Sequence, residues 1–359
     1  MYRSPRNCNL GRMPKRPVRK SLDDYYARIA RWQLAPLWER LAKLVPPEPQ
    51  IDAVPHLWDY DALRPILLES AELIAEDDAE RRVLILENPG LSGQSAATNT
   101  LFAGLQLIMP GEIAPSHRHT PAALRFIIES QDAYTSVNGE RADMSPGDFI
   151  LTPSWCWHDH CHEGEDPVVW LDVLDLPLVR AIGSRFVEHY PEQRVPERAR
   201  SDENFYRYGM NMAPVGGERS GRTSLLRYPF ERAREALEKM KARSEWDASH
   251  GLKMEYIDPM TGGSVMPTLS AFLQLLPSGF SGTRYQSSEG AVYCVVSGRG
   301  SVIVGTGKNK EVFSYKPNDV LAIPCWCAHA FAATEESVLF SASDRGLQTQ
   351  LGIWRERRG

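Results

Sequence analysis

The stretch PGDFILTPSWCWHDH, residues 146–160, decides the fold because a second version of it, PNDVLAIPCWCAHAF, occupies residues 317–331. Both copies place a proline five residues before a histidine, which is His158 in the first copy and His329 in the second. Two more blocks recur in the same order: LQLIMPG is echoed by LQLLPSG, and ALRFIIES by AVYCVVSG. Ordered repeats of this kind indicate a duplicated structural unit. We therefore expect two lobes of common design.

The repeated regions have the texture of antiparallel β-structure. Short runs of β-branched and aromatic residues alternate with turn formers, as in AYTSVNGE and GDFILTP, which is typical of sandwiches and barrels. Helical spacing of apolar residues precedes the first lobe, and ERAREALEKMKARSEW predicts a helix between the lobes. The expected organisation is a basic flexible tail at 1–20, an N-terminal helical segment at 21–80, a first lobe at 81–190, a linker with a helix at 191–255 and a second lobe at 256–350.

Composition excludes several classes of partner. The 359 residues include 41 basic and 46 acidic side chains, for a net charge of -5, so no overall basic field suggests a nucleic acid. No apolar segment approaches the roughly 18 residues that span a bilayer, and the N-terminus lacks an apolar signal core. We expect a cytoplasmic protein without a membrane partner. The basic tail is expected to be mobile, with an organellar address or a polyanion-binding arm as alternatives.

Histidines gather in the first lobe, where five of the nine lie between His117 and His162. Side chains alternate along a strand, so His117 and His119 share one face, as do His158 and His160. Imidazole is a good ligand for Fe, Zn, Cu, Ni and Mn. A pair on one strand and a third ring from a neighbouring strand predict a metal site with open coordination positions. The isolated His56, His189 and His250 are expected to be ordinary surface or hydrogen-bonded residues.

Cys156 and Cys161 raise the alternative of a Cys/His zinc site. The two cysteines have opposite parity on a strand, so both cannot face one ion together with His158 while the strand stays regular. Structural zinc sites also favour paired Cys-x2-Cys spacing, which is absent here. The six cysteines are too few for a disulfide scaffold in a chain of this length, and we expect them to be reduced.

The histidine motifs resemble those of a known family. GEIAPSHRH (residues 111–119) followed by GDFILTPSWCWH (residues 147–158) resembles the two motifs of the cupins, which are small β-barrels with a metal at the mouth. More narrowly, HRHTPAALRFIIES, PGDFILTPSWCWHDH and DPVVWLDVLDLPLV resemble the gentisate 1,2-dioxygenase family, which includes salicylate, 5-nitrosalicylate and 1-hydroxy-2-naphthoate dioxygenases. The resemblance implies an all-β dominated bicupin, with two double-stranded β-helix barrels and with N-terminal and linker helices.

The resemblance also implies a chemistry. Many cupins carry a glutamate four or five residues after the paired histidines, whereas this chain has Ala123 and Leu124 there. The family implies Fe(II) held by three neutral ligands, His117, His119 and His158. The implied enzyme is an extradiol-type 1,2-dioxygenase that uses O2 to split the bond between the carboxyl- and hydroxyl-bearing carbons of a small aromatic acid. Gentisate is the expected substrate, with 5-nitrosalicylate, salicylate and 1-hydroxy-2-naphthoate as alternatives, and the relatives imply a homotetramer.

Several polar residues are candidates for substrate contacts in the first lobe. Arg125 lies in an apolar run, where an unpaired charge would be costly, and its planar fork of donors suits a carboxylate. His160 shares a strand face with His158 and could position substrate or act as an acid or base. The family resemblance carries substrate binding over to Arg81, Gln106 and Asp172. Asp172 could instead orient a ligand histidine.

The second lobe reads as a degenerate copy. Where the first lobe has SHRHT, the second has GTRYQ, so Thr283 and Tyr285 are expected at the aligned ligand positions and only His329 survives. We expect this lobe to serve packing and subunit contacts. Two other functional classes remain open at this stage: a non-catalytic metal-binding bicupin and a cupin isomerase.

Overall fold

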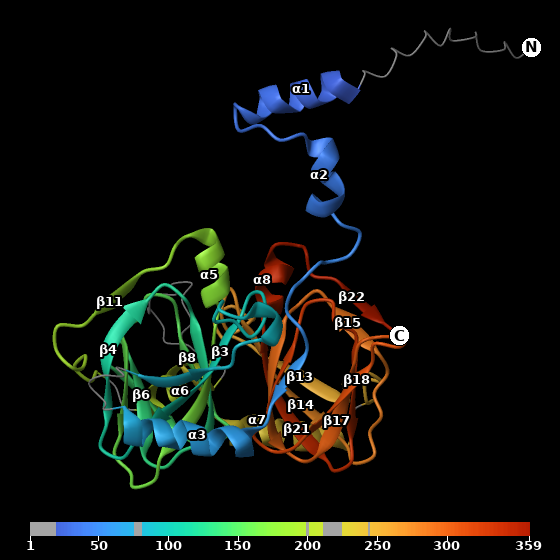
Figure 1. Ribbon diagram of the computed structural model, residues 1–359. Helices are drawn as coiled ribbons and strands as arrows, with labels where there is room; N and C mark the ends of the chain where they lie inside the picture. The colour runs from blue at the N-terminus through green and yellow to red at the C-terminus, as the bar shows by residue number, and fades with distance from the viewer. Residues whose placement is uncertain (1–18, 75–80, 199–200, 211–224, 243–244) are drawn as a thin grey trace, which may run out of the picture. The chain divides into compact units, whose positions relative to one another are not determined.

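The computed structural model describes residues 19–74, 81–198, 201–210, 225–242 and 245–359 (Figure 1). Contacts divide the chain into two compact units, Met1–Gln50 and Ile51–Gly359. The first unit contains helices α1 (Arg19–Ala30) and α2 (Leu37–Leu44). The Tyr26 hydroxyl connects the two helices, because it donates to Glu39 at 2.7 Å and accepts from Trp38 Nε1 at 2.9 Å. Residues 1–18 of the predicted basic tail lie outside the described residues.

The second unit contains two β-barrels, each built from two sheets (Figure 1). In the first barrel a six-stranded sheet has the order β12-β8-β5-β10-β3-β2, and a five-stranded sheet has the order β11-β4-β9-β6-β7. All pairs in these sheets are antiparallel, as the turn-separated β runs predict. The strands are β2 (Arg82–Ile85), β3 (Phe102–Ile108), β4 (Ile113–His119), β5 (Ala123–Glu129), β6 (Ala133–Val137), β7 (Glu140–Met144), β8 (Phe149–Thr152), β9 (His158–His162), β10 (Val168–Leu174), β11 (Val187–His189) and β12 (Arg227–Tyr228).

The second barrel repeats this plan. Its six-stranded sheet has the order β1-β19-β16-β21-β14-β13, and its five-stranded sheet has the order β18-β17-β20-β15-β22. The predicted bicupin architecture is thus confirmed. The strands are β1 (His56–Trp58), β13 (Leu252–Tyr256), β14 (Ser270–Leu276), β15 (Tyr285–Ser287), β16 (Ala291–Ser297), β17 (Gly300–Val304), β18 (Glu311–Tyr315), β19 (Val320–Ile323), β20 (His329–Ala333), β21 (Ser337–Ser343) and β22 (Glu356–Arg358).

Helices connect and flank the barrels in the second unit. None of the described helices is both long enough and apolar enough to cross a bilayer. Asp59 caps the longest of them by accepting a hydrogen bond from Ala62 N at 3.2 Å, which satisfies a backbone donor of the first turn. The helices are α3 (Tyr60–Leu73), the 3-10 turn η1 (Pro89–Leu91), α5 (Leu176–Ile182), α6 (Ser201–Tyr208), α7 (Phe230–Lys241) and α8 (Arg345–Gln350).

Because side chains alternate along a strand, one face of the six-stranded sheet packs between the barrels and the other face points into its own barrel. Odd-numbered residues of β3, such as Leu105, join even-numbered residues of β5 and β21 in one large cluster, where Phe126 stacks on Phe340 with ring centroids 4.3 Å apart. This cluster joins the six-stranded sheets of the two barrels face to face. The other face of β3, which includes Gly104 and Gln106, turns into the barrel. The polar site residues that belong to strands therefore lie on the inner face because of their parity.

The predicted segment boundaries remain a proposal. Three strands begin within stretches that the sequence assigned to the N-terminal segment and the linker. They add edges to the sheets, because β1 pairs with β19, β12 with β8 and β13 with β14. Short pairing segments of this kind carry too few residues to show a two-residue period in the sequence.

Candidate metal centre

Three histidines meet at one place in the first barrel. His117 and His119 lie on β4, and His158 lies directly opposite His117 on β9. Their ligand nitrogens all fall within 4.8 Å of one another, and this is the one such group of His, Cys, Asp or Glu side chains among the residues that the structure describes. A bulge between Ala114 and His117 shifts the register just before the pair. Bulges often re-aim side chains beside functional sites.

Hydrogen bonds fix how two of the rings face the site. His119 Nδ1 lies 2.7 Å from Pro121 O, and His158 Nδ1 lies 3.0 Å from Cys156 O. Because a carbonyl only accepts, each Nδ1 carries the proton and each Nε2 offers a lone pair. The buried His117 Nδ1 has no hydrogen-bond partner in the described structure. The three side chains therefore have the donor arrangement of a three-nitrogen metal site.

The environment keeps these histidines neutral. Burial lowers the pKa of His117 to about 2, helped by the nearby charge of Arg81, and lowers the pKa of His119 to about 4. Burial likewise holds the pKa of His158 well below its usual range. A neutral imidazole is the form that binds a metal ion. The rings are therefore in the ligand form at neutral pH without first losing a proton.

Arg125 is buried beside the triad and has its own acid partner. Its Nε lies 3.3 Å from Asp172 Oδ1, and its Nη1 donates to Thr152 Oγ1 at 2.7 Å. The other Asp172 oxygen accepts from Trp170 Nε1 at 2.9 Å. Asp172 therefore orients Arg125, and among the described residues it makes no hydrogen bond to a ligand histidine. The register of β5 and β10 produces this pairing, because it sets Arg125 opposite Asp172 on the inner face.

His160 lies next to the triad without joining it. Its ring centroid is 6.0 Å from that of His158 and 5.0 Å from that of Trp170. Its Nδ1 lies 2.9 Å from Thr135 Oγ1, and the residue is almost fully buried. Burial holds the pKa of His160 well below its usual range. The side chain is thus a neutral imidazole tethered at one nitrogen.

Arg81 and Gln106 enter from the neighbouring strands. Arg81 lies just before β2 and donates from Nη2 to Pro115 O at 2.8 Å. Its positive charge helps to lower the pKa values of all four histidines described above, which places it close to them. Gln106 is 3% exposed and lies on β3 opposite Trp170 of β10. Gln106 thus faces the interior of the barrel that holds the triad, and Arg81 lies close to the four histidines.

The cysteines do not build a competing metal site. Cys161 alternates to the other face of β9 from His158, where it lies opposite Ile113 and Tyr134. Neither Cys161 nor Cys156 joins the metal-ligating group among the described residues. The zinc alternative is therefore not supported, for the parity reason that the sequence suggested.

Sequence reasoning missed His189. This exposed histidine lies on β11, which pairs with β4 so that His189 stands opposite His117, with ring centroids 6.3 Å apart. Arg118 holds the strand in place through an ion pair with Glu188, and its guanidinium lies 4.6 Å from the ring of Trp155. Only the pairing of β11 brings His189 to the site, and no motif of the sequence contains it.

The structure of the second barrel shows which of its residues stand at the positions of the metal ligands, and it corrects the alignment expected from the sequence. Tyr285 stands opposite His329 on β15 and β20, just as His117 stands opposite His158. The ligand positions are therefore occupied by Tyr285 and Ser287, and the expectation of Thr283 and Tyr285 was wrong by two residues. The error arose because GTRYQ was matched to SHRHT by its letters, and a shift of two residues keeps every side chain on the same face.

Comparisons with known proteins agree with this geometry. A family model described as a cupin domain matches residues 104–174. The chain is 45% identical over 345 residues to gentisate 1,2 dioxygenase 1 of Aquipseudomonas alcaligenes, covering 96% of this chain and 98% of that protein. It is 35% identical over 353 residues to a gentisate 1,2-dioxygenase of Ralstonia sp, covering 97% and 96%. A solved structure of the salicylate 1,2-dioxygenase from Pseudoaminobacter salicylatoxidans, described as adducts with gentisate, has a TM-score of 0.86 and 30% identity, covering 98% of this chain and 97% of that one. The chain belongs to the gentisate 1,2-dioxygenase family.

Proposed function

We propose that the protein is an iron(II)-dependent dioxygenase that uses O2 to cleave the C1–C2 bond of gentisate, between the carboxyl- and hydroxyl-bearing carbons. The observation that carries this proposal is the set of three neutral imidazoles, two of them buried and one partly buried, beside a buried guanidinium. The 45% identical relative, which is named for gentisate, supports the choice of substrate. Gentisate is thus the first compound to test.

The proposed ligands are His117, His119 and His158, and the donor set fits iron(II). Imidazole suits Fe, Zn, Cu and Ni, and a three-nitrogen site with open positions is a form that non-haem iron sites can take. When bound, the iron supplies the open coordination positions and the redox chemistry through which substrate and O2 react. Because all three ligands are neutral, the site favours an anionic substrate over a neutral one.

Arg125 is proposed to bind the substrate carboxylate. Asp172 and Thr152 engage its Nε and Nη1 atoms, which leaves the Nη2 donors of the fork for the substrate. A guanidinium held at two of its nitrogens loses little side-chain entropy when it binds a ligand. Asp172 thus takes part by positioning Arg125, and its own substrate contact remains a proposal.

His160 is proposed to hold or move a proton at the substrate hydroxyl. Thr135 fixes its Nδ1, so Nε2 is the atom that can accept or donate. A neutral imidazole can take the hydroxyl proton as the substrate binds and can return it later. Arg81 and Gln106 are proposed to contact the oxygen substituents of the ring from the neighbouring strands.

Purified protein loaded with ferrous iron should consume O2 when given gentisate, and the absorbance of the aromatic ring should fall in parallel. The same assay with salicylate, 5-nitrosalicylate and 1-hydroxy-2-naphthoate decides among the alternative substrates and should give lower kcat/KM values. Product analysis tests whether the bond cleaved lies between the substituted carbons, which also decides whether the extradiol-type label applies. No O2 uptake with any of the four acids would leave a non-catalytic bicupin or an isomerase as the account of the site.

The assembly is proposed to be a homotetramer. Several large apolar side chains of the first unit are exposed in the single chain, as expected where other chains cover them in an assembly. These residues are Trp32, Leu34, Leu37, Trp38, Leu41, Leu44 and Val45. Sedimentation of the purified protein should give four chains per particle, and a monomer would contradict the proposal.

A further inference from the structure

The second barrel keeps a polar interior after losing its metal ligands. At the register positions of Arg125 and Asp172 it has Tyr293 and Ser341, which face each other on β16 and β21. The second barrel has a cation on a different strand. Lys253 on β13 stands opposite Gln274 of β14, on the inner face.

Two cations meet over one aromatic ring in this interior. The ammonium of Lys253 lies 4.6 Å from the ring centroid of Phe272, and the guanidinium of Arg345 lies 5.8 Å from it. Neither cation has a carboxylate within ion-pairing distance among the described residues. The nearby acid is Glu289, whose oxygens accept hydrogen bonds from Ser287 at 3.3 Å and from Ser343 at 2.9 Å. The interior therefore holds two cations that contact aromatic rings but form no ion pair among the described residues.

Burial disfavours the charge on Lys253. Desolvation lowers the pKa of Lys253, although Glu289 acts in the opposite direction. A half-buried ammonium without an ion pair is costly, and an anion placed beside it would offset that cost. The cluster formed by Lys253, Arg345 and Phe272 is thus better suited to a complex with an anion than to the ligand-free protein.

Gln274 adds an acceptor at the same place. It is 1% exposed, and its buried Oε1 has no hydrogen-bond partner in the part of the chain that the structure describes. Its Nε2 donates to His250 O at 2.8 Å, so the amide cannot turn without breaking that bond. Gln274 stands opposite Lys253, so an unused acceptor lies next to an unpaired cation. A ligand that satisfies both atoms carries an acid and a hydroxyl donor.

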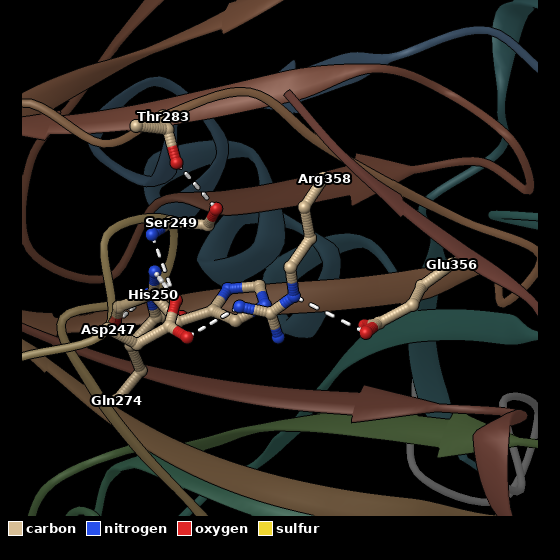
Figure 2. A network of polar contacts seen from close by, with 7 residues as sticks. All are labelled: Asp247, Ser249, His250, Gln274, Thr283, Glu356 and Arg358. Atoms are coloured by element: carbon tan, nitrogen blue, oxygen red, sulfur yellow. Dashed lines mark hydrogen bonds and ion pairs between the residues drawn. The ribbon is translucent and has the colours of Figure 1, made fainter.

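A polar network holds this arrangement in place (Figure 2). Asp247 accepts from the backbone N of His250 at 2.9 Å and binds Arg358 at 2.5 Å, while Arg358 also reaches Glu356 at 3.3 Å. The strand β22 thereby fixes the loop that presents His250, whose ring centroid lies 4.3 Å from that of Tyr285. These contacts keep the groups around the cluster in one geometry before any ligand arrives.

We propose that the second barrel binds a small hydroxycarboxylate without a metal, with the carboxylate between Lys253 and Arg345 and the hydroxyl donating to Gln274 Oε1. Tyr285 and Ser287 stand where the metal ligands of the first barrel stand, and the two cations oppose a bound metal ion. This site is separate from the ring-cleavage site and does not depend on the proposed reaction.

Anaerobic isothermal titration calorimetry tests the site with the full-length protein. After chelation of all metal, salicylate should still bind at one site per chain, and Lys253→Met should weaken this binding by at least about tenfold, because a hydrogen bond to a charged group is lost. Benzoate, which lacks the hydroxyl, should bind more weakly than salicylate. Lys253→Arg should retain most of the affinity.

A matched control is Lys239→Met, which removes the same charge from an exposed position on α7 and should leave the binding unchanged. The thermal unfolding midpoint of each variant shows whether it has folded. The proposal is overturned if chelated wild-type protein binds no salicylate, or if folded Lys253→Met binds it as tightly as the wild type does. Because no iron or O2 is present, failure here leaves the ring-cleavage proposal untouched, and failure of ring cleavage leaves this titration valid.

Discussion

The two barrels share a scaffold but differ in what surrounds one histidine. His158 and His329 each approach a backbone carbonyl two residues earlier, Cys156 O and Cys327 O, through Nδ1 at 3.0 Å. Both therefore present Nε2 in the same way. In the first barrel two further imidazoles complete a set of metal ligands, whereas in the second a phenol and a hydroxyl occupy those positions. The fold fixes the orientation of one ligand, and the neighbouring side chains decide whether a metal can bind.

The buried charges differ in the same way. The first barrel pairs Arg125 with Asp172, and both are buried. The second barrel has Tyr293 and Ser341 in those places, and its Lys253 forms no ion pair with any residue that the structure describes. A paired guanidinium is ready to orient an anion that binds elsewhere, at the proposed metal. An unpaired ammonium must itself supply the attraction.

Removing Arg125 should have the largest effect on stability and on activity. Arg125→Met leaves Asp172 buried without its cation, which should lower the free energy of unfolding by about 3–5 kcal/mol. The kcat/KM for gentisate should fall by at least about 100-fold, because a charge-assisted contact to the carboxylate is lost. Urea unfolding and oxygen uptake measure the two effects.

Tyr293, which occupies the position of Arg125 in the second barrel, provides the control. Tyr293→Phe should change the free energy of unfolding by less than about 1 kcal/mol and should leave kcat/KM as it is. The double change Arg125→Met with Asp172→Asn should recover part of the stability, because no unpaired charge remains. Equal effects of Arg125→Met and Tyr293→Phe would remove the proposed difference between the barrels.

Acid should destabilise metal-depleted protein through histidines of both barrels. Burial lowers the pKa of His119 and of His329 to about 4 each, against about 6.5 in the unfolded chain. Because the folded pKa is the lower one, each histidine contributes full stability above pH 6.5. That stability is lost as the pH falls from 6.5 towards 4, by about 2 kcal/mol per histidine at pH 5.

Unfolding of the chelated protein at pH 7.5 and pH 5 measures this dependence. His119→Gln and His329→Gln should each flatten it by a similar amount, because each removes one titrating ring. Iron should restore the stability of the first barrel only. A pH dependence unchanged in both variants would contradict the neutral, buried state of these rings.

His189 should have the smallest effect. The side chain is exposed and stands opposite the ligand His117 across β11 and β4, so it borders the site without being enclosed. His189→Ala should raise the KM for gentisate a few-fold, by less than about 1 kcal/mol, and leave kcat nearly unchanged. Arg358→Ala changes the corresponding residue opposite Tyr285 and should alter neither constant, so steady-state kinetics of the two variants tests the comparison.

Much of the first barrel could be predicted from the sequence. Parity along a strand placed His117 and His119 together, and the repeated motif supplied His158 from a second strand. The buried Arg125 was recognisable because a charge in an apolar run needs a partner. These inferences succeed because strand alternation is a local property that the sequence carries directly.

Other features depend on pairing between distant segments. The partner of Asp172 is set by the register of β5 and β10, and His189 reaches the site only through β11. The misplacement of the second-barrel ligands by two residues has the same cause, since alternation cannot distinguish shifts of two. The site formed by Lys253, Gln274 and Arg345 contains no motif, because its residues come from three separate segments.

The most direct test of the central claim compares iron content and oxygen uptake in His158→Ala and His329→Ala. The wild type should hold one iron per chain and consume O2 with gentisate. His158→Ala should weaken metal binding by more than about 100-fold, since loss of an outer-shell partner alone costs 10- to 100-fold, and should lose oxygen uptake. His329→Ala should keep both properties. Retention of iron and turnover by His158→Ala, or their loss in folded His329→Ala, would contradict the assignment of the chemistry to the first barrel.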